Sequence, residues 1–377
     1  MNRHGGLWAE LTSFSNLLLA AERAAAGKRN RPDVAVFLLN LEGEILQLRR
    51  ELQDGAYRPG PYRSFRVHDP KPRLISAAPF RDRVVHHALT QLLEPLFERR
   101  FSKNSFACRE GFGTHRALAR AREGARNCRF VLKCDIRKYF PSIDHGILKN
   151  LLARVLKCGP TLDLAAKIID GSNVQEEVIA YFPGDDLFTP YERRRGLPLG
   201  NQTSQFFANV YLDPLDQMID RQLRPDLYIR YVDDFLLFGD SKARLGEMRR
   251  QIQNRLWDLR LNLHPGKSRV YTVADGVTFL GWRIFPDHTR LARQNVVGFR
   301  RRMRVLQRQY AQGAMDWDGI RQRVRAWIAH AAHGNTWELR GQLFEGFAFA
   351  QGVRSDRACC SRGVLEQQSE ESPRCEP

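Results

Sequence analysis

The chain has 377 residues, and 60 Lys and Arg against 42 Asp and Glu give it a formal charge of +18. This length allows a substantial core in two or three packed subdomains. The charge favours a nucleic acid as partner, the alternative being a ribosome-like or merely soluble basic protein. The apolar run at residues 17–21 is too short to span a bilayer, and the seven cysteines form no paired C-x-x-C array, so neither a membrane role nor a zinc site is expected. An odd number of cysteines without a secretion signal predicts a cytoplasmic protein.

The first third of the chain predicts helices interrupted by one basic extended segment. Leu38, Leu41, Ile45, Leu48 and Leu52 recur every three or four residues, which predicts one buried helix face. Residues 59–61 (Pro-Gly-Pro) then break the chain, and the basic stretch 68–75 is typical of a strand or hairpin. Helical periodicity returns at 83–99.

The middle of the chain alternates strands with helices. Expected in order are a strand at 130–135, a helix capped by Asp144, an irregular insertion at 173–195, a helix at 203–223, a hairpin at 229–238, a helix at 245–259 and a strand pair at 277–284. The pattern after residue 290 is purely helical, and a tail from about residue 352 is expected to be disordered. The fold class predicted is α+β, a small antiparallel sheet backed by helices, with a helical domain appended.

Three carboxylates carry the chemical signal. Asp233 and Asp234 lie between two apolar strands, where a hairpin tip would place them at the end of a sheet, and Asp135 ends another apolar strand. Buried carboxylates are costly without a compensating cation, and three of them suit two Mg²⁺ ions, which prefer oxygen ligands. The alternative is that Asp233-Asp234 is only a turn, but the apolar flanks and the matching Asp135 strand favour a metal site.

Tyr231-Val-Asp-Asp234, together with Asp135 and Phe140 five residues later, resembles the palm of reverse transcriptases. The sequence blocks of that family can be placed in order from Lys71 to Trp282. The resemblance implies a right-hand polymerase fold: N-terminal helices and fingers at 1–125, a palm at 126–290 with part of the fingers (150–200) inserted, and a helical thumb at 291–350. Residues 351–377 would be the disordered tail.

The same resemblance implies a role for each matching residue. Asp135, Asp233, Asp234 and the Ile136 carbonyl would bind two Mg²⁺ ions, with Mn²⁺ as an alternative. Phe140 would be the steric gate that clashes with a ribose 2′-hydroxyl, although it is also apolar enough for the core. The nucleotide pocket would comprise Lys71, Arg73, Phe140, Leu199, Gly200, Gln205 and Lys267, and the primer grip Phe279, Leu280, Gly281 and Trp282.

One departure from the common pattern narrows the subfamily. Leu199 stands where most reverse transcriptases have Gln, and Ser204-Gln205 where they have Ser-Pro. This variant resembles the prokaryotic or phage-encoded enzymes of diversity-generating retroelements. That likeness implies error-prone copying at template adenines and a small basic accessory protein that forms a pentamer. Loss of a polar pocket side chain fits weaker discrimination between base pairs.

The expected activity is therefore RNA-directed DNA polymerisation, a nucleotidyltransferase reaction on an RNA template and an RNA/DNA primer duplex with dNTPs. Two alternatives stay open: a reverse transcriptase of an antiphage defence system, and a catalytically inactive RNA-binding scaffold. In the C-terminal helices Phe299, Met303, Leu306 and Tyr310 form an apolar stripe, and the arginines around it are suited to a phosphate backbone or to a solvated face.

Overall fold

The computed structural model describes residues 3–68, 72–172 and 176–350. The chain divides between Ala292 and Arg293 into two compact units, and each is described by itself. The tail predicted to be disordered lies outside the described residues.

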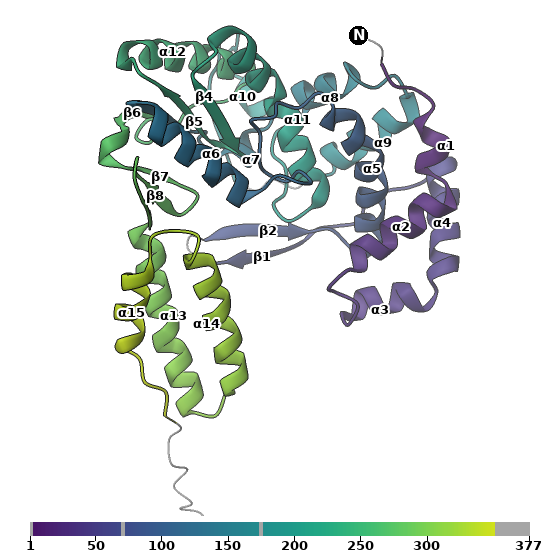
Figure 1. Cartoon of the computed structure of the whole chain (residues 1–377). Coiled ribbons are helices and arrows are strands. Elements are labelled where there is room, and N and C mark those ends of the chain that lie inside the picture. Colours follow the sequence, from purple (N-terminus) through teal and green to yellow (C-terminus); the bar gives the residue numbers. More distant parts are fainter. Residues whose placement is uncertain (1–2, 69–71, 173–175, 351–377) are drawn as a thin grey trace, which may run out of the picture. The chain divides into compact units, whose positions relative to one another are not determined.

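The N-terminal part of the first unit is a group of helices (Figure 1): α1 (Leu7–Leu11), α2 (Phe14–Ala25), α3 (Pro32–Leu39), α4 (Leu41–Gln53) and α5 (Phe80–Glu98). The prediction of one helix face from Leu38 to Leu52 is wrong at its start, because Asn40 leaves the helical backbone and separates α3 from α4. The Asn40 side chain folds over Gly43, where a Cβ would lie only 2.6 Å from its Oδ1. Ile45, Leu48 and Leu52 are buried as expected.

A two-stranded hairpin leads from these helices toward the centre of the unit. It pairs β1 (Arg63–Val67) with β2 (Arg73–Ala77) in antiparallel register, as the basic stretch predicted. The residues of β1 are all exposed, and Ser76 in β2 is buried. Figure 1 shows the two strands as a separate ribbon below the central sheet.

The central sheet has four antiparallel strands in the order β4-β5-β3-β6. They are β3 (Phe130–Asp135), β4 (Leu227–Tyr231), β5 (Asp234–Gly239) and β6 (Arg269–Thr272). Helices α6 (Thr114–Asn127) and α12 (Lys242–Asp258) pack on the sheet, and α6 approaches so closely that a Cβ on Gly124 would meet the Phe238 ring at 2.7 Å. The expected strand at 130–135, the hairpin and the helix before residue 259 are confirmed, and so is the α+β class with antiparallel sheets.

The remaining helices of the first unit stand in the chain between β3 and β4. They are α7 (Tyr139–Ser142), α8 (His145–Ala153), α9 (Gly159–Asp170), α10 (Thr189–Glu192) and α11 (Gln202–Met218), which continues as a π-helical turn at Ile219–Leu223. Asp144 caps α8 by accepting a hydrogen bond from the Ile147 N–H, as predicted. The segment expected to be irregular contains the short α10.

A second sheet of three short strands ends the first unit. It consists of β7 (Val277–Phe279), β8 (Trp282–Ile284) and β9 (Thr289–Leu291), all antiparallel. The expected strand pair is confirmed, with β9 added. In the described part of the chain, no helix is long and apolar enough to cross a membrane.

The second unit is helical, with α13 (Arg293–Ala311), α14 (Trp317–Ala331) and α15 (Trp337–Glu345). Phe299, Met303 and Leu306 are buried, and the Phe299 ring stacks on Trp327 with 3.7 Å between centroids. Trp317 and Trp337 are 52% and 81% exposed, whereas Trp327 is buried. Trp317 and Trp337 are the first residues of α14 and α15, and the buried residues of each helix come later in its sequence.

Candidate active site

The three predicted carboxylates meet at one end of the central sheet. Asp135 and Asp234 are directly opposite each other in the paired strands β3 and β5. Asp233 lies in the tight turn between β4 and β5, and its carbonyl accepts a hydrogen bond from the Ile136 N–H at 3.1 Å. That bond fixes the turn against the residue that follows Asp135, so Ile136 lies beside the carboxylates as well.

Two lysines accompany these carboxylates. The Lys267 ammonium nitrogen is 3.1 Å from both oxygens of Asp135, and the Lys133 nitrogen is 3.5 Å from Oδ2 of Asp234. Lys133 also donates to the Thr278 carbonyl at 2.6 Å, which joins β7 to the site. Lys133 was not among the residues predicted from the sequence, although it stands two residues before Asp135 and so faces the same side of β3.

Burial dominates the electrostatics of the turn. Burial raises the pKa of Asp234 to about 7; Lys133 opposes this shift and the neighbouring Asp135 adds to it. The pKa of Asp233 is raised as well, first by burial and then by Asp135, against the opposing charges of Arg73 and Lys267. Oδ1 of Asp234 is buried and has no hydrogen-bond partner among the described residues.

The chemistry of these donors fits a divalent cation, although the three carboxylates of the described chain are not gathered around one point. A desolvated, unpartnered carboxylate oxygen is costly, and a cation would compensate it. Among the residues described, no group of three or more His, Cys, Asp or Glu side chains is arranged closely enough to hold a metal ion, and Asp135 and Asp234 each contact a lysine instead.

The segment predicted to line the nucleotide pocket is fastened to β2. The Leu199 carbonyl accepts a hydrogen bond from Ser76 N–H at 3.0 Å, and the buried Asn201 side chain bonds the backbone of Ser76 and Ala78. Gly200 has φ +111°, and a Cβ there would lie 2.9 Å from Cγ2 of Ile75. Asn201 was missed by the sequence analysis, because nothing in its neighbourhood identified β2 as its partner.

The other predicted pocket residues fall in different surroundings. Phe140 is half-buried in α7, and its carbonyl accepts a hydrogen bond from Leu197 N–H at 3.0 Å. Arg73 begins β2, and its charge acts on Asp233. Gln205 is exposed on α11, and Lys71 lies outside the described residues.

The predicted primer grip forms the turn between β7 and β8. Phe279 and Trp282 are fully buried, whereas Leu280 and Gly281 are half-buried with φ of +48° and +83°. The Lys133 bond to Thr278 links this turn to the carboxylates.

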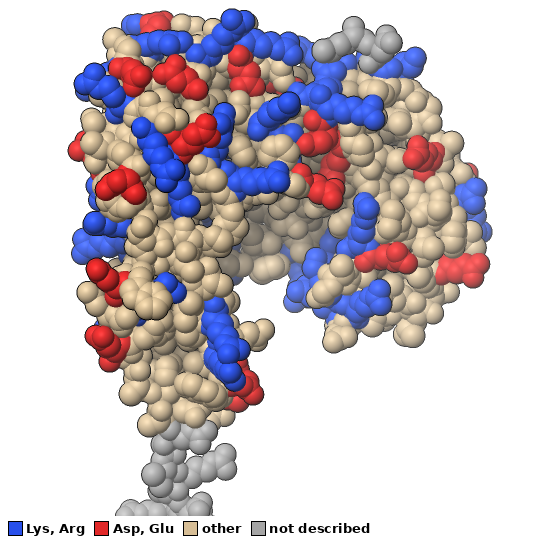
Figure 2. All heavy atoms as spheres, viewed as in Figure 1, with Lys and Arg blue, Asp and Glu red and all other residues tan. Residues whose placement is uncertain are grey.

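On the face drawn in Figure 2, Lys and Arg side chains outnumber Asp and Glu, in keeping with the net charge.

The carboxylate pair at the hairpin tip and the third carboxylate on the adjoining strand form the arrangement that the resemblance to polymerase palms implies. Residues 67–284 match the family described as "Reverse transcriptase (RNA-dependent DNA polymerase)". This match covers more than half of the chain, which therefore belongs to the reverse transcriptase family. Its palm-and-fingers fold follows from that membership.

Several curated proteins are similar to this chain. Protein YkfC of Escherichia coli is 26% identical over 296 residues, 67% of this chain and 74% of that protein. The group II intron-encoded protein LtrA of Lactococcus lactis is 25% identical over 181 residues, 47% of this chain and 28% of LtrA. Nuclear intron maturase 2 of Arabidopsis thaliana is 28% identical over 229 residues, 49% of this chain and 31% of the maturase. The chain thus spans less than a third of these two intron proteins.

Proposed function

We propose that this chain is an active RNA-directed DNA polymerase that adds dNTPs to a primer 3′-hydroxyl on an RNA template. The observation that carries the proposal is the pairing of Asp135 with Asp234 next to Asp233, at a place where burial raises the pKa of two of the three carboxyls. Burying such carboxylates without a partner costs free energy, and a bound cation would offset that cost.

Asp135, Asp233 and Asp234, with the Ile136 carbonyl, are the residues that would hold Mg²⁺ or Mn²⁺. When bound, such ions activate the attacking hydroxyl and stabilise charge on the leaving pyrophosphate. Lys267 and Lys133 would keep the carboxylates apart and partly neutralised until then, because each already contacts one of them. Arg73 would attract the triphosphate, since a guanidinium suits bidentate phosphate contacts.

Phe140, Leu199 and Gly200 would shape the nucleotide pocket. We assign Phe140 to the face below the sugar, where a ring excludes a 2′-hydroxyl. Gly200 would allow the backbone to approach the base pair closely. Because Gly200 has no Cβ, this backbone can also pack directly against Ile75. The turn at 279–282 would support the primer end, and the helices α13 to α15 would act as a thumb on the duplex.

The finer proposal is error-prone copying at template adenines, as in diversity-generating retroelements, with a small basic accessory protein as a partner. It rests on Leu199 and on Ser204-Gln205. The family match supports the polymerase, and LtrA and the Arabidopsis protein are named for an intron and a maturase, so the subtype is left to experiment.

Primer extension on an RNA template with Mg²⁺ tests the proposed activity. The wild-type chain is expected to extend the primer, and Asp233→Asn to lose at least about a hundredfold in rate, as expected when a charge-stabilising group is removed. Asp240→Asn, at an exposed position just after β5, is the control and should retain activity. Equal extension by wild type and Asp233→Asn would contradict the proposed site, and a chain that binds RNA without extending any primer would be a scaffold.

A further inference from the structure

The turn that presents Asp233 and Asp234 has an unfavourable backbone. Val232 has φ +59°, in the left-handed region that a β-branched residue rarely adopts. Such a conformation persists only where surrounding contacts determine it. The contacts that hold Val232 therefore matter to the carboxylates that follow it.

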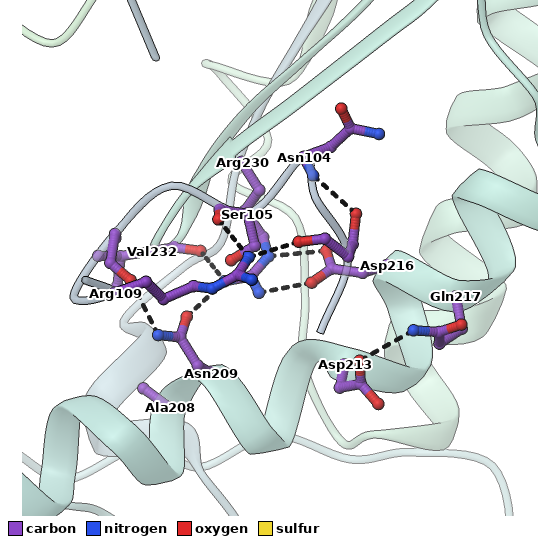
Figure 3. Close-up of polar contacts among 12 residues, drawn as sticks. Asn104, Ser105, Arg109, Ala208, Asn209, Asp213, Asp216, Gln217, Arg230 and Val232 are labelled. Carbon is purple, nitrogen blue, oxygen red and sulfur yellow. Dashed lines mark hydrogen bonds and ion pairs between the residues drawn. The ribbon is translucent and has the colours of Figure 1, made fainter. Parts of the chain in front are cut away.

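The side chain of Arg230 makes those contacts from two residues before (Figure 3). Its Nη1 donates to the Val232 carbonyl at 3.1 Å and to Oδ1 of Asn209 at 3.2 Å. Its Nε and Nη2 donate to the two carboxylate oxygens of Asp216, at 2.7 and 2.5 Å. Four hydrogen bonds thus fix one guanidinium in one orientation, which an ammonium with a single nitrogen cannot reproduce.

The groups that hold Arg230 are rigidly placed. Asp216 and Asn209 both belong to α11, and Asp216 also accepts from the Tyr228 hydroxyl at 2.6 Å. The Asn209 amide donates to the Ala107 carbonyl at 2.9 Å. Arg230 and Asp216 are each 0% exposed. The turn is therefore connected to a helix in the interior of the first unit.

The backbone of Arg230 is held on its other side as well. Its N–H donates to the Asn104 carbonyl at 2.7 Å, and its carbonyl accepts from Phe106 N–H at 2.9 Å. The segment around Ser105 thus covers the free edge of β4, and Figure 3 shows it beside the guanidinium. Both the main chain and the side chain of Arg230 are fixed.

Stability alone does not explain this ion pair. Two charges removed from water are often no better for stability than apolar residues of the same volume. We propose that Arg230, oriented by Asp216, is a positioning residue: through the Val232 carbonyl it sets the turn that carries Asp233 and Asp234. The reaction it serves is that of the proposed function, on which this inference rests.

The decisive variant replaces the whole charged group with apolar residues: Tyr228→Phe, Asp216→Leu and Arg230→Met together. It leaves no charge and no hydroxyl of this group unpaired, so the chain is expected to fold. The Val232 carbonyl and Oδ1 of Asn209 lose the donor that Arg230 supplied. Arg230→Lys keeps the charge without the fork and is the second variant. Leu48→Ala, in the core of the N-terminal helices, is the control for lost stability alone.

Two readouts separate positioning from mere stability. We expect the triple variant and Arg230→Lys to lose about ten- to a hundredfold in kcat with primer–template affinity changed less than about twofold, because small misplacement of reacting groups costs that much. Amide hydrogen exchange of residues 231–236, measured without metal, should accelerate in both variants. Leu48→Ala should lower the melting temperature and leave both readouts unchanged.

The outcomes are distinct. A triple variant with wild-type kcat and wild-type exchange in the turn overturns the inference. If the wild-type chain extends no primer on any template, the proposed function fails, and exchange in the turn alone then decides: faster exchange retains the positioning role, and unchanged exchange removes it.

Discussion

The ammonium nitrogen of Lys267 lies 3.1 Å from both carboxylate oxygens of Asp135. A bound metal ion would compete with Lys267 for the same oxygens. The positive charge of Lys267 would, however, help to stabilise a leaving pyrophosphate. Lys267→Met should therefore bind Mg²⁺ more readily but catalyse more slowly.

We expect Lys267→Met to reach half-maximal activity at a lower Mg²⁺ concentration and to have a maximal rate about ten- to a hundredfold lower. Titration of Mg²⁺ in a single-nucleotide incorporation assay measures both. Lys149→Met, which removes a lysine paired with Asp170, should change neither quantity. A lower rate without a shift in Mg²⁺ requirement would mean that Lys267 does not compete with the metal ion for Asp135.

Gly200→Ala should impair the chain in two ways, because Gly200 has φ +111° and an added Cβ would lie only 2.9 Å from Cγ2 of Ile75. The strained backbone alone costs on the order of 1 kcal/mol or more. We expect a lower melting temperature and a higher KM for dNTP. Adding Ile75→Ala should recover only the part that is due to the clash.

Gly246→Ala is the control for this substitution. Gly246 lies in α12 with nothing within 4 Å of a built Cβ, so alanine there should be neutral or slightly stabilising. Equal effects of the two substitutions would contradict the assigned constraint at Gly200.

Phe140→Ala should relax the choice between deoxy- and ribonucleotides. Removing the ring opens space for the 2′-hydroxyl, so the ratio of kcat/KM for dNTP over rNTP should fall at least tenfold, which corresponds to a loss of about 1.4 kcal/mol of discrimination. Phe140→Tyr, which retains the ring, should keep the ratio. An unchanged ratio in Phe140→Ala would assign Phe140 to the core.

Leu199→Gln tests the error-prone proposal. A polar side chain at this half-buried position should restore a hydrogen-bonding contact and reduce misincorporation opposite template adenine severalfold. Leu199→Met keeps the site apolar and should retain the wild-type errors. Sequencing of cDNA from one RNA template measures the errors, and a uniformly low error rate in the wild type would remove the subtype while leaving the polymerase.

The buried His86 and the partly buried Asp213, far apart in sequence, should make the free energy of unfolding depend on pH in opposite directions. Burial lowers the pKa of His86 to about 3, so its contribution is complete above the unfolded pKa near 6.5 and is lost as the pH falls below it. Burial raises the pKa of Asp213 to about 6, so that carboxyl favours the folded chain when protonated, and this contribution is lost as the pH rises through 6.

Melting temperatures at pH 7 and pH 5 measure the two effects. His86→Gln should lose less stability than the wild type on acidification, and Asp213→Asn should lose more. Each variant serves as the control for the other. Identical pH dependence in both would mean that neither group titrates as its burial requires.

The sequence predicted the hairpin and the β3 strand because apolar flanks around acidic residues are a local pattern. It did not predict Arg230 as a buried residue, because its partner Asp216 stands on a helix fourteen positions earlier and nothing local links them. Strand alternation alone could have placed Lys133 on the same side as Asp135. Its contact with Asp234 could not be predicted, because it depends on the pairing of β3 with β5. Asn40 interrupts the regular leucine period by leaving the helical backbone, at φ −121°, and hydrophobic periodicity does not register such a break.

The measurement that tests the account most directly is a double-mutant cycle on Asp135 and Asp233. Groups that act as one unit lose their function together, so Asp135→Asn, Asp233→Asn and the double variant should all show the same low rate of primer extension on RNA. Losses that add in the double variant would mean that the two carboxylates serve separate roles and do not share one catalytic site.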